Sequence, residues 1–212
     1  THKTSSAASD VYKRQYKTLK VGVVSSGNEL IKSGKKIKDH QVYDSNKYQI
    51  IHFLKKFNIS VHDLGILKDD EIKVDKFYKK NQNKFDIIIS SGGSSFSSKD
   101  YISSFLSQNT ELLFKYVRIQ PGRPVIFSKL KFNYYFSLPG NPLAVFTNLF
   151  FLVSLFIDPS RKDNSSITKF YQSGFSENKK SNLTKFYRVK LSKNILYTCL
   201  LYTSDAADDV LW

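Results

Sequence analysis

A serine- and glycine-rich segment that follows a hydrophobic run has the composition of a phosphate-binding turn. It reads SSGGSSFSS and covers residues 90–98. Gly92 and Gly93 leave the backbone N–H groups unobstructed, and a helix that begins after the segment adds the positive end of its dipole. Such a turn suits a phosphate or a similar oxyanion. The same composition also fits a flexible linker, or a tight turn that needs glycine only for a positive φ angle.

Carboxylates stand in other turns that come after, or close to, apolar runs. They are Glu29 in SSGNEL, Asp44 in YDSN, Asp69 and Asp70 in KDD, and Asp100 in SSKDY. Carboxylates gathered at one edge of a sheet could hold Mg²⁺ and position phosphates. Taken singly, each is typical of a solvated surface acid or of a helix cap. Asn46, also in YDSN, adds an amide that could contact a ligand.

Two Pro-Gly turns, QPGRP (120–124) and LPGNP (138–142), follow the serine-glycine segment. Rigid turns of this kind are usually scaffolding. Arg118 and Arg123 could bind an anion through their planar guanidinium groups. The four histidines lack metal-ligand spacing, and one cysteine cannot build a zinc–cysteine site. The chain contains no nucleophile elbow and no Ser-His-Asp order.

The elements that must position these residues alternate between strand and helix. The apolar patterns predict strands at 19–25, 59–67 and 85–90, and helices at 44–58, 68–84 and 100–108. Two strands around the Pro-Gly turns follow at 117–138, and then a long buried helix at 141–157 with Asn141 as its cap and Pro142 in its first turn. This order predicts an α/β fold with an open, mostly parallel sheet and helices on both faces. Ligands bind at the carboxyl ends of such strands, which favours a ligand loop over a linker at 90–98.

Composition and charge set broad limits on the class of protein. The chain has 212 residues, 41% of them hydrophobic and 15% aromatic, which excludes a disordered chain. No apolar run is long enough to span a membrane. The net charge of +15 comes from lysines that are spread along the chain, so nucleic acid is not the expected partner. The single cysteine fits a reducing, cytoplasmic setting.

The two ends differ in composition from the middle of the chain. Residues 1–15 and 199–212 are rich in Ala, Ser and Asp, and we interpret them as a non-native leader and a non-native tail. Residues 16–159 then form the α/β domain. Residues 160–198 form a linker and the start of a small β domain that is not completed.

The motifs taken together resemble one enzyme family. SSGNEL, YDSN, DLGILKDD, SSGGSSFSSKDY, QPGRP and SLPGNPLAV occur in the order found in molybdopterin molybdenumtransferases, the MoeA family that includes the gephyrin E domain. The resemblance covers about residues 19–158 and implies a molybdopterin-binding α/β domain, followed by a small β domain that begins near TKFYRVKL. It implies insertion of molybdate into adenylylated molybdopterin with release of AMP. It also implies a homodimer for the full-length protein.

The resemblance assigns roles to particular residues. Glu29, Asp69 and Asp100 would be the acidic catalytic residues and would coordinate Mg²⁺. The expected contacts with the pterin substrate and its phosphates are Gly27, Asp44, Asn46, Ser91, Gly92, Gly93, Ser95, Arg123, Pro139, Gly140, Asn141 and Pro142. The sequence departs from the family pattern at Asn28, where Asp is usual, and at Ser97, where a third loop glycine is usual.

Other functions are compatible with parts of the pattern. A molybdopterin adenylyltransferase has the same kind of domain standing alone, but the LPGNP helix followed by a new β segment favours the molybdenumtransferase. A CinA-like enzyme would carry a Gly-Leu-Gly-Pro-Thr loop, which is absent. A non-catalytic pterin-binding scaffold and a basic nucleic-acid-binding domain are the alternatives outside the enzymes.

Overall fold

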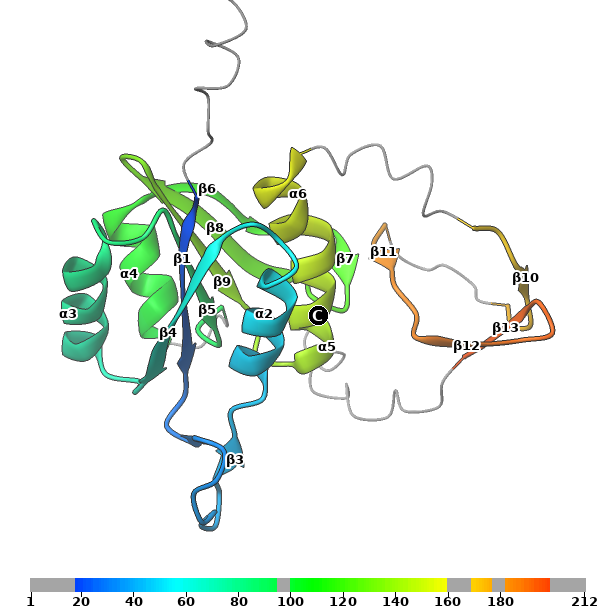
Figure 1. Cartoon of the computed structure of the whole chain (residues 1–212), viewed down its shortest axis with the longest axis horizontal. Coiled ribbons are helices and arrows are strands. Elements are labelled where there is room, and N and C mark those ends of the chain that lie inside the picture. Colours follow the sequence, from blue (N-terminus) through cyan, green and yellow to red (C-terminus); the bar gives the residue numbers. More distant parts are fainter. Residues whose placement is uncertain (1–17, 95–99, 160–168, 177–181, 199–212) are drawn as a thin grey trace, which may run out of the picture.

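The computed structural model describes residues 18–94, 100–159, 169–176 and 182–198. Its centre is a six-stranded sheet in the order β4-β1-β5-β9-β8-β6 (Figure 1). The strands are β1 (Lys20–Ser26), β4 (Ser60–Leu67), β5 (Ile87–Ser91), β6 (Glu111–Tyr116), β8 (Pro124–Leu130) and β9 (Asn133–Leu138). The pairs β1–β4, β1–β5 and β5–β9 are parallel, whereas β8 runs antiparallel to both β9 and β6. The prediction of an open, mostly parallel sheet is confirmed.

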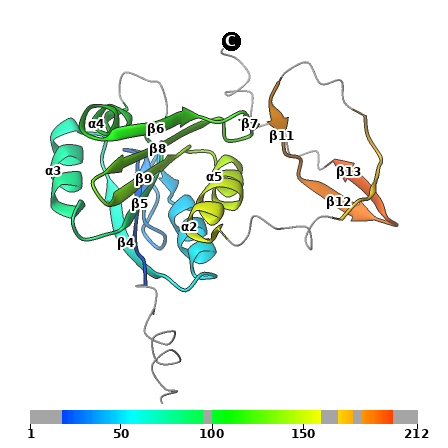
Figure 2. The ribbon, with the colours of Figure 1, turned by 90° about the horizontal axis from the view of Figure 1, so that it is seen from above.

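Helices cover both faces of this sheet, as predicted (Figures 1 and 2). On one face lie α2 (Asn46–Leu54) and α5 (Pro142–Asn148), which continues through a π-helical stretch, η1 (Leu149–Val153), into α6 (Ser154–Ile157). On the other face lie α3 (Glu71–Asn81) and α4 (Tyr101–Asn109). The long helix expected at 141–157 is therefore present, with a π-helical stretch in its middle.

Alternate residues of the central strands enter two separate hydrophobic cores. Ile87 and Ile89 of β5 pack with α2 and α5, whereas Ile88 between them packs with α3 and α4. All three are at most 1% exposed, and each such side chain contributes roughly 1.5–3 kcal/mol by its burial. A strand buried on both faces reads as a continuous apolar run, which is why the sequence predicts this one directly.

Polar side chains cap the helices where the sequence places them. Asp70 accepts a hydrogen bond from the Lys73 N–H (2.9 Å) at the start of α3, and Asn141 accepts one from the Leu143 N–H (2.9 Å) at the start of α5. That bond lowers the pKa of Asp70. Asn141, the predicted cap, and Asp70, an acid expected near the start of its helix, therefore fix the chain direction where it leaves the sheet edge.

Several short strands were not predicted. A two-residue ribbon, β2 (Leu30–Ile31) with β3 (Val42–Tyr43), extends from the end of β1. The edge strand β6 was missed as well. In the region expected to start a small β domain, β10 (Gln172–Ser173), β13 (Ile195–Thr198) and β12 (Val189–Ser192) form a three-stranded sheet.

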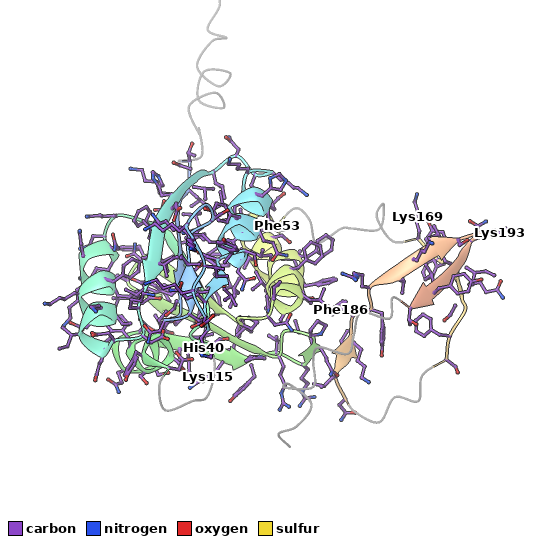
Figure 3. The ribbon with its side chains drawn as sticks, turned by 90° about the horizontal axis from the view of Figure 1, so that it is seen from below. His40, Phe53, Lys115, Lys169, Phe186 and Lys193 are labelled. Carbon is purple, nitrogen blue, oxygen red and sulfur yellow. The ribbon has the colours of Figure 1, made fainter. Side chains whose placement is uncertain are left out.

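This small sheet is joined to the α/β part by a parallel pair, β7 (Ile119–Gln120) with β11 (Thr184–Lys185). The Thr184 N–H donates to the Arg118 carbonyl (2.7 Å). Phe186 directly follows β11 (Figure 3). Its ring stacks on that of Phe151, with 4.0 Å between ring centres. Among the described residues, no helix combines the length and the hydropathy needed to cross a membrane.

Candidate functional site

The carboxyl ends of four parallel strands lie at the same level of the sheet. Ser25 of β1 is paired with Ser91 of β5, Ser91 with Leu138 of β9, and Ser26 of β1 with Leu67 of β4. The turns that follow these strands are therefore neighbours along one edge. Because β8 runs in the opposite direction, its beginning at QPGRP reaches the same edge. The expectation that the motifs share one sheet edge is met by this register.

The glycine turn after β5 presents backbone N–H groups. Gly92 and Gly93 both have left-handed φ angles, +82° and +80°. The Ser137 hydroxyl lies 3.3 Å from the Gly92 carbonyl oxygen and 2.9 Å from that of Gly93, and donates to them. The N–H of a trans peptide points opposite to its C=O. The N–H groups of Gly93 and Ser94 are therefore turned away from Ser137, which is an arrangement suited to an anion.

No side chain fits at either glycine. A Cβ atom on Gly92 would lie 2.5 Å from the carbonyl oxygen of Ser26, and one on Gly93 would lie 2.8 Å from Cβ of Ile102. The turn is thus wedged between the end of β1 and helix α4. Glycine is required here for close packing as well as for its φ angle.

Two carboxylates lie at the turn that follows β1. The Ser26 hydroxyl donates to Oδ1 of Asp69 (2.9 Å), and the Asn28 N–H donates to Oδ2 (3.2 Å). The Glu29 carboxylate folds back over Gly27, where an added Cβ would be 2.6 Å from Oε1. Since Gly92 also packs against Ser26, Glu29, Asp69 and the glycine turn converge on the end of β1.

Asn28 preserves hydrogen bonds of the β1 turn at the position where the motif resemblance leads us to expect Asp. Its Oδ1 accepts the Asp69 N–H (3.3 Å), and its carbonyl oxygen accepts the Lys68 ammonium (3.0 Å). A carboxylate oxygen would accept the same N–H. The departure therefore removes a negative charge next to Glu29 without removing a hydrogen bond.

Asp100 is placed differently from Glu29 and Asp69. It is 7% exposed and accepts the Ser103 N–H (2.9 Å) as the cap of α4. Burial raises the pKa of Tyr78, and the charge of Asp100 adds a smaller rise. Within the described part of the chain, no three His, Cys, Asp or Glu side chains gather to hold a metal ion. The structure thus does not bring Glu29, Asp69 and Asp100 together as one ligand group.

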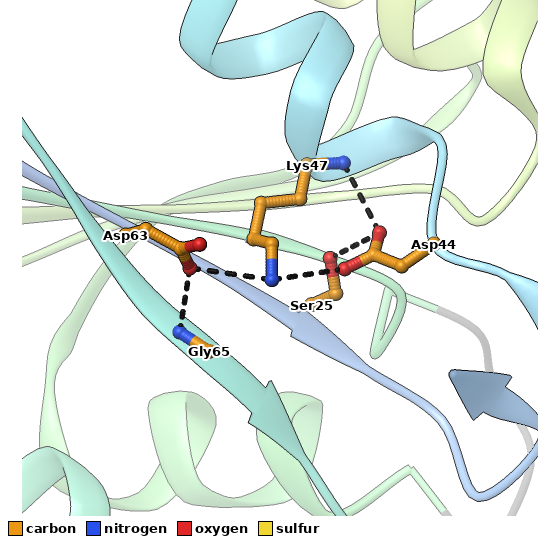
Figure 4. A network of polar contacts seen from close by, with 5 residues as sticks. All are labelled: Ser25, Asp44, Lys47, Asp63 and Gly65. Carbon is orange, nitrogen blue, oxygen red and sulfur yellow. Dashed lines mark hydrogen bonds and ion pairs between the residues drawn. The ribbon is translucent and has the colours of Figure 1, made fainter. Parts of the chain in front are cut away.

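Asp44 lies beneath the edge in a buried polar network (Figure 4). It is 2% exposed and accepts the Ser25 hydroxyl (2.8 Å). The Lys47 ammonium lies 3.3 Å from Asp44 Oδ2 and 3.2 Å from Asp63 Oδ1. Asp63 Oδ1 also accepts the Gly65 N–H (2.8 Å). Asp44 Oδ1 thus accepts the Ser25 hydroxyl and Oδ2 faces the Lys47 ammonium, and the contact of Asp44 with substrate stays a prediction.

The two Pro-Gly turns complete the edge. Nδ2 of Asn46 donates to the Gly140 carbonyl oxygen (2.6 Å), which joins the start of α2 to the LPGNP turn. Nδ2 of Asn148 donates to the Gly122 carbonyl oxygen (3.0 Å) and holds QPGRP against α5. The exposed guanidinium of Arg123 lies 5.9 Å from the centre of the Tyr116 ring.

The sequence of this edge-forming part of the chain matches a known protein family. Residues 22–158 match the model described as "Probable molybdopterin binding domain". The chain belongs to this family.

Relatives of this molybdopterin-binding domain carry consistent names. The "Molybdopterin molybdenumtransferase" of Haemophilus influenzae is 36% identical over 138 residues, which is 65% of this chain and 34% of that protein. The protein of the same name from Nostoc is 31% identical over 134 residues, 61% of this chain and 31% of that protein. The resemblance inferred from the motifs is confirmed. The chain spans about a third of the length of these curated relatives.

A solved structure supports the fold of the domain. The "molybdopterin biosynthesis moea protein" of Pyrococcus horikosii aligns with a TM-score of 0.71 at 27% identity, over 86% of this chain and 45% of that one. The aligned share exceeds the α/β part.

Most of the predicted site residues of the molybdopterin-binding domain lie along the edge. These are Gly27, Glu29, Asn46, Asp69, Ser91, Gly92, Gly93, Arg123, Pro139, Gly140, Asn141 and Pro142. Asp44 and Asp100 are enclosed beneath it. Ser95 and Ser97 fall outside the described residues.

Three residues that matter to the edge were missed by sequence reasoning. Ser26 and Ser137 were available as signals, since Ser26 lies within SSGNEL and Ser137 begins SLPGNPLAV, two motifs that were singled out. Lys47 gave no such signal because lysine is almost always exposed, and here it is 1% exposed.

Proposed function

We propose that the whole protein inserts molybdate into adenylylated molybdopterin with release of AMP. In this proposal the present chain supplies the surface that holds the phosphate-bearing end of the pterin. One observation carries the argument: the N–H groups of Gly93 and Ser94 are turned away from Ser137, in a turn that packs against Ser26, whose hydroxyl donates to Asp69. The names of the relatives indicate transfer of molybdenum to molybdopterin, and the adenylylated substrate and the release of AMP follow from the motif resemblance.

The residues at the edge would then have separate roles in binding the substrate. The N–H groups of the glycine turn bind phosphate oxygens, and the exposed Arg123 adds a cation at the next turn. Asn46 and Gly140, joined by a short hydrogen bond, would line one side of the substrate site at the LPGNP turn. The neighbouring residues of the turn, Pro139, Asn141 and Pro142, would hold its backbone in place. Asp100 contributes by fixing the start of α4 under the phosphate turn.

Magnesium fits this edge as a metal shared between protein and substrate. Mg²⁺ is commonly held by one or two carboxylates together with phosphate oxygens and water. Glu29 and Asp69 supply two carboxylates at the β1 turn, whereas Asp100 is used as a helix cap. When bound there, the metal would neutralise charge on the phosphates and the leaving AMP.

The test uses the full-length protein and a matched pair of substitutions. Glu29→Gln removes one charge from an exposed side chain, so the fold should be retained. It should lower the rate of AMP release from adenylylated molybdopterin with molybdate by about 100-fold. Glu111→Gln makes the same chemical change at the amino end of β6, on the opposite edge, and should leave the rate within about twofold.

Two outcomes would contradict the proposal. Equal rates for Glu29→Gln and wild type would remove Glu29 from the reaction. Formation of the AMP ester from ATP and free molybdopterin would instead identify an adenylyltransferase. The full-length gene should also restore molybdoenzyme activity in a strain that lacks the transferase. By the same resemblance, we expect a cytoplasmic homodimer, which ultracentrifugation and fractionation would check.

A further inference from the structure

We propose that Lys47 is a positioning residue for the pterin-binding edge: a buried ammonium that holds the turn carrying Asn46. This inference rests on the proposed function, because it concerns the same edge. Lys47 does not reach the edge itself. It acts through Asp44, which begins the turn, and through Asn46, which ends it.

The burial of Lys47 is the first observation. Its side chain and that of Asp44 are each 1% exposed, whereas Asp63 is 46% exposed. The groups that face the ammonium are the two carboxylates and, at 5.8 Å from its centre, the ring of Tyr48. An ammonium removed from water is tolerated only when it is paired. Lys47 and Asp44 therefore depend on each other.

The strand β4 is shaped to receive this cation. Its pairing with β1 shifts register between Val23 and Ser25, and Gly65 in the shifted stretch has a φ angle of +88°. The Gly65 N–H donates to the carboxylate of Asp63 and holds it toward Lys47 (Figure 4). The Lys47 ammonium thus joins the start of α2 to β4 through Asp63, and to β1 through Asp44 and Ser25.

The network leads directly to the ligand-binding edge. Asp44 is fixed from three sides, by the Ser25 hydroxyl, the Lys47 N–H (3.2 Å) and the Lys47 ammonium. Two residues later, Asn46 donates to Gly140 at 2.6 Å. Lys47, immediately after Asn46, anchors the turn at its far end. Release of the ammonium would free the turn and let the Asn46 amide leave the LPGNP turn.

The experiment separates positioning from stability in the full-length protein. Lys47→Met alone leaves Asp44 buried and unpaired, so its thermal midpoint should fall markedly. Lys47→Met with Asp44→Asn removes both buried charges and keeps an oxygen for the Ser25 hydroxyl, so the midpoint should return to within a few degrees of wild type. Lys79→Met with Asp75→Asn, which removes an exposed ion pair of α3 by the same chemical changes, is the control.

The decisive readouts are hydrogen exchange and ligand binding. In the folded double variant, exchange in residues 42–54 should rise at least about tenfold, and the calorimetric affinity for adenylylated molybdopterin should fall about tenfold. The control with Lys79→Met and Asp75→Asn should change both by less than about threefold. Lys47→Arg keeps the charge and should keep most of the affinity.

The inference is overturned if the double variant matches wild type in exchange and in affinity. It is also overturned if a folded Lys47→Arg variant binds as weakly as the double variant. Wild-type protein that binds no adenylylated molybdopterin would contradict the proposed function, but hydrogen exchange would still test the link between Lys47 and the turn.

Discussion

At the scale of single residues, one buried hydroxyl sets the direction of the N–H groups in the glycine turn. Ser137 is 0% exposed and lies at the end of β9, under both glycine carbonyls. Its proton is shared between two acceptors, so the carbonyl oxygens of Gly92 and Gly93 are both held toward Ser137. The electrostatic character of the turn thus depends on a residue that would never touch the ligand.

Ser137→Ala should weaken binding more than it weakens the fold. Loss of the shared hydrogen bond removes about 1 kcal/mol of stability and lets the Gly92 and Gly93 peptides rotate. We expect about a tenfold lower affinity for adenylylated molybdopterin by calorimetry. Ser128→Ala is the matched control, because Ser128 is equally buried in the neighbouring strand and has no hydrogen-bond partner among the described residues. Its removal should be neutral or stabilising, and equal effects of the two variants would refute the role of Ser137.

Single-residue roles could be predicted only in part. The glycines and the acidic residues were found because their types are unusual in a turn after an apolar strand. The enclosure of Asp44 was not, because it depends on the ion pair with Lys47 and on the register shift of β4. Neither feature leaves a periodic trace in the sequence.

At the scale of elements, the two glycines that follow β5 are tightly constrained. They combine left-handed φ angles with contacts that leave no room for a Cβ atom. One side of the turn is a backbone carbonyl, which cannot move without moving β1. Substitutions here should therefore disturb the sheet edge as well as the turn.

Gly92→Ala should lower the free energy of unfolding by at least about 2 kcal/mol, from strain in φ and from the contact with Ser26. Gly34→Ala isolates the first effect. Gly34 also has a left-handed φ angle, +85°, but an added Cβ would meet no described atom within 4 Å. Its cost should be about 1 kcal/mol. Urea unfolding of both variants is the measurement, and equal costs would show that the close approach to Ser26 does not matter.

The elements themselves were predictable in proportion to their burial. β5 was found because all five of its residues are buried. β6 was missed because it lies at the sheet edge and leaves Leu112 and Leu113 41% and 43% exposed, so its pattern neither alternates nor runs apolar throughout. The β2–β3 ribbon has two residues in each strand, which is too short for any periodicity.

At the scale of the whole molecule, the core under α3 and α4 contains phenol groups without access to water. Tyr78 and Tyr135 are 2% and 1% exposed, and burial raises the pKa of each above its ordinary value of 10.0. In the unfolded chain these groups lose their protons from about pH 10 upward, but in the folded protein they do not. The resulting stability is complete below pH 10 and is lost as the pH rises above it.

Tyr78→Phe should therefore flatten the alkaline loss of stability. Each buried tyrosine makes the free energy of unfolding fall by up to about 1.4 kcal/mol per pH unit above 10. Urea unfolding of wild type and variant between pH 9 and 11 measures the two slopes. The variant should retain the smaller slope that Tyr135 contributes, and identical slopes would contradict this account.

The junction between β7 and β11 is the second feature at this scale. Phe186→Ala removes the ring stacked on Phe151 and about 2 kcal/mol of burial. We expect faster tryptic cleavage at Lys185 and Arg188 with little change in the melting of the α/β part. Tyr197→Ala, in β13 and 46% exposed, serves as the control and should leave the cleavage rate nearly unchanged. Equal cleavage of the two variants would show that the stacked ring does not hold the junction.

The reversed direction of β8 has a practical consequence for labelling the protein. The β8–β9 hairpin reaches the ligand edge with both of its open ends, so its closed end, at Lys131 and Phe132, points to the opposite side. Phe132 is 90% exposed, and strands of six or seven residues place it about 20 Å from the phosphate turn. A fluorophore or an epitope tag inserted there would report on binding without obstructing it.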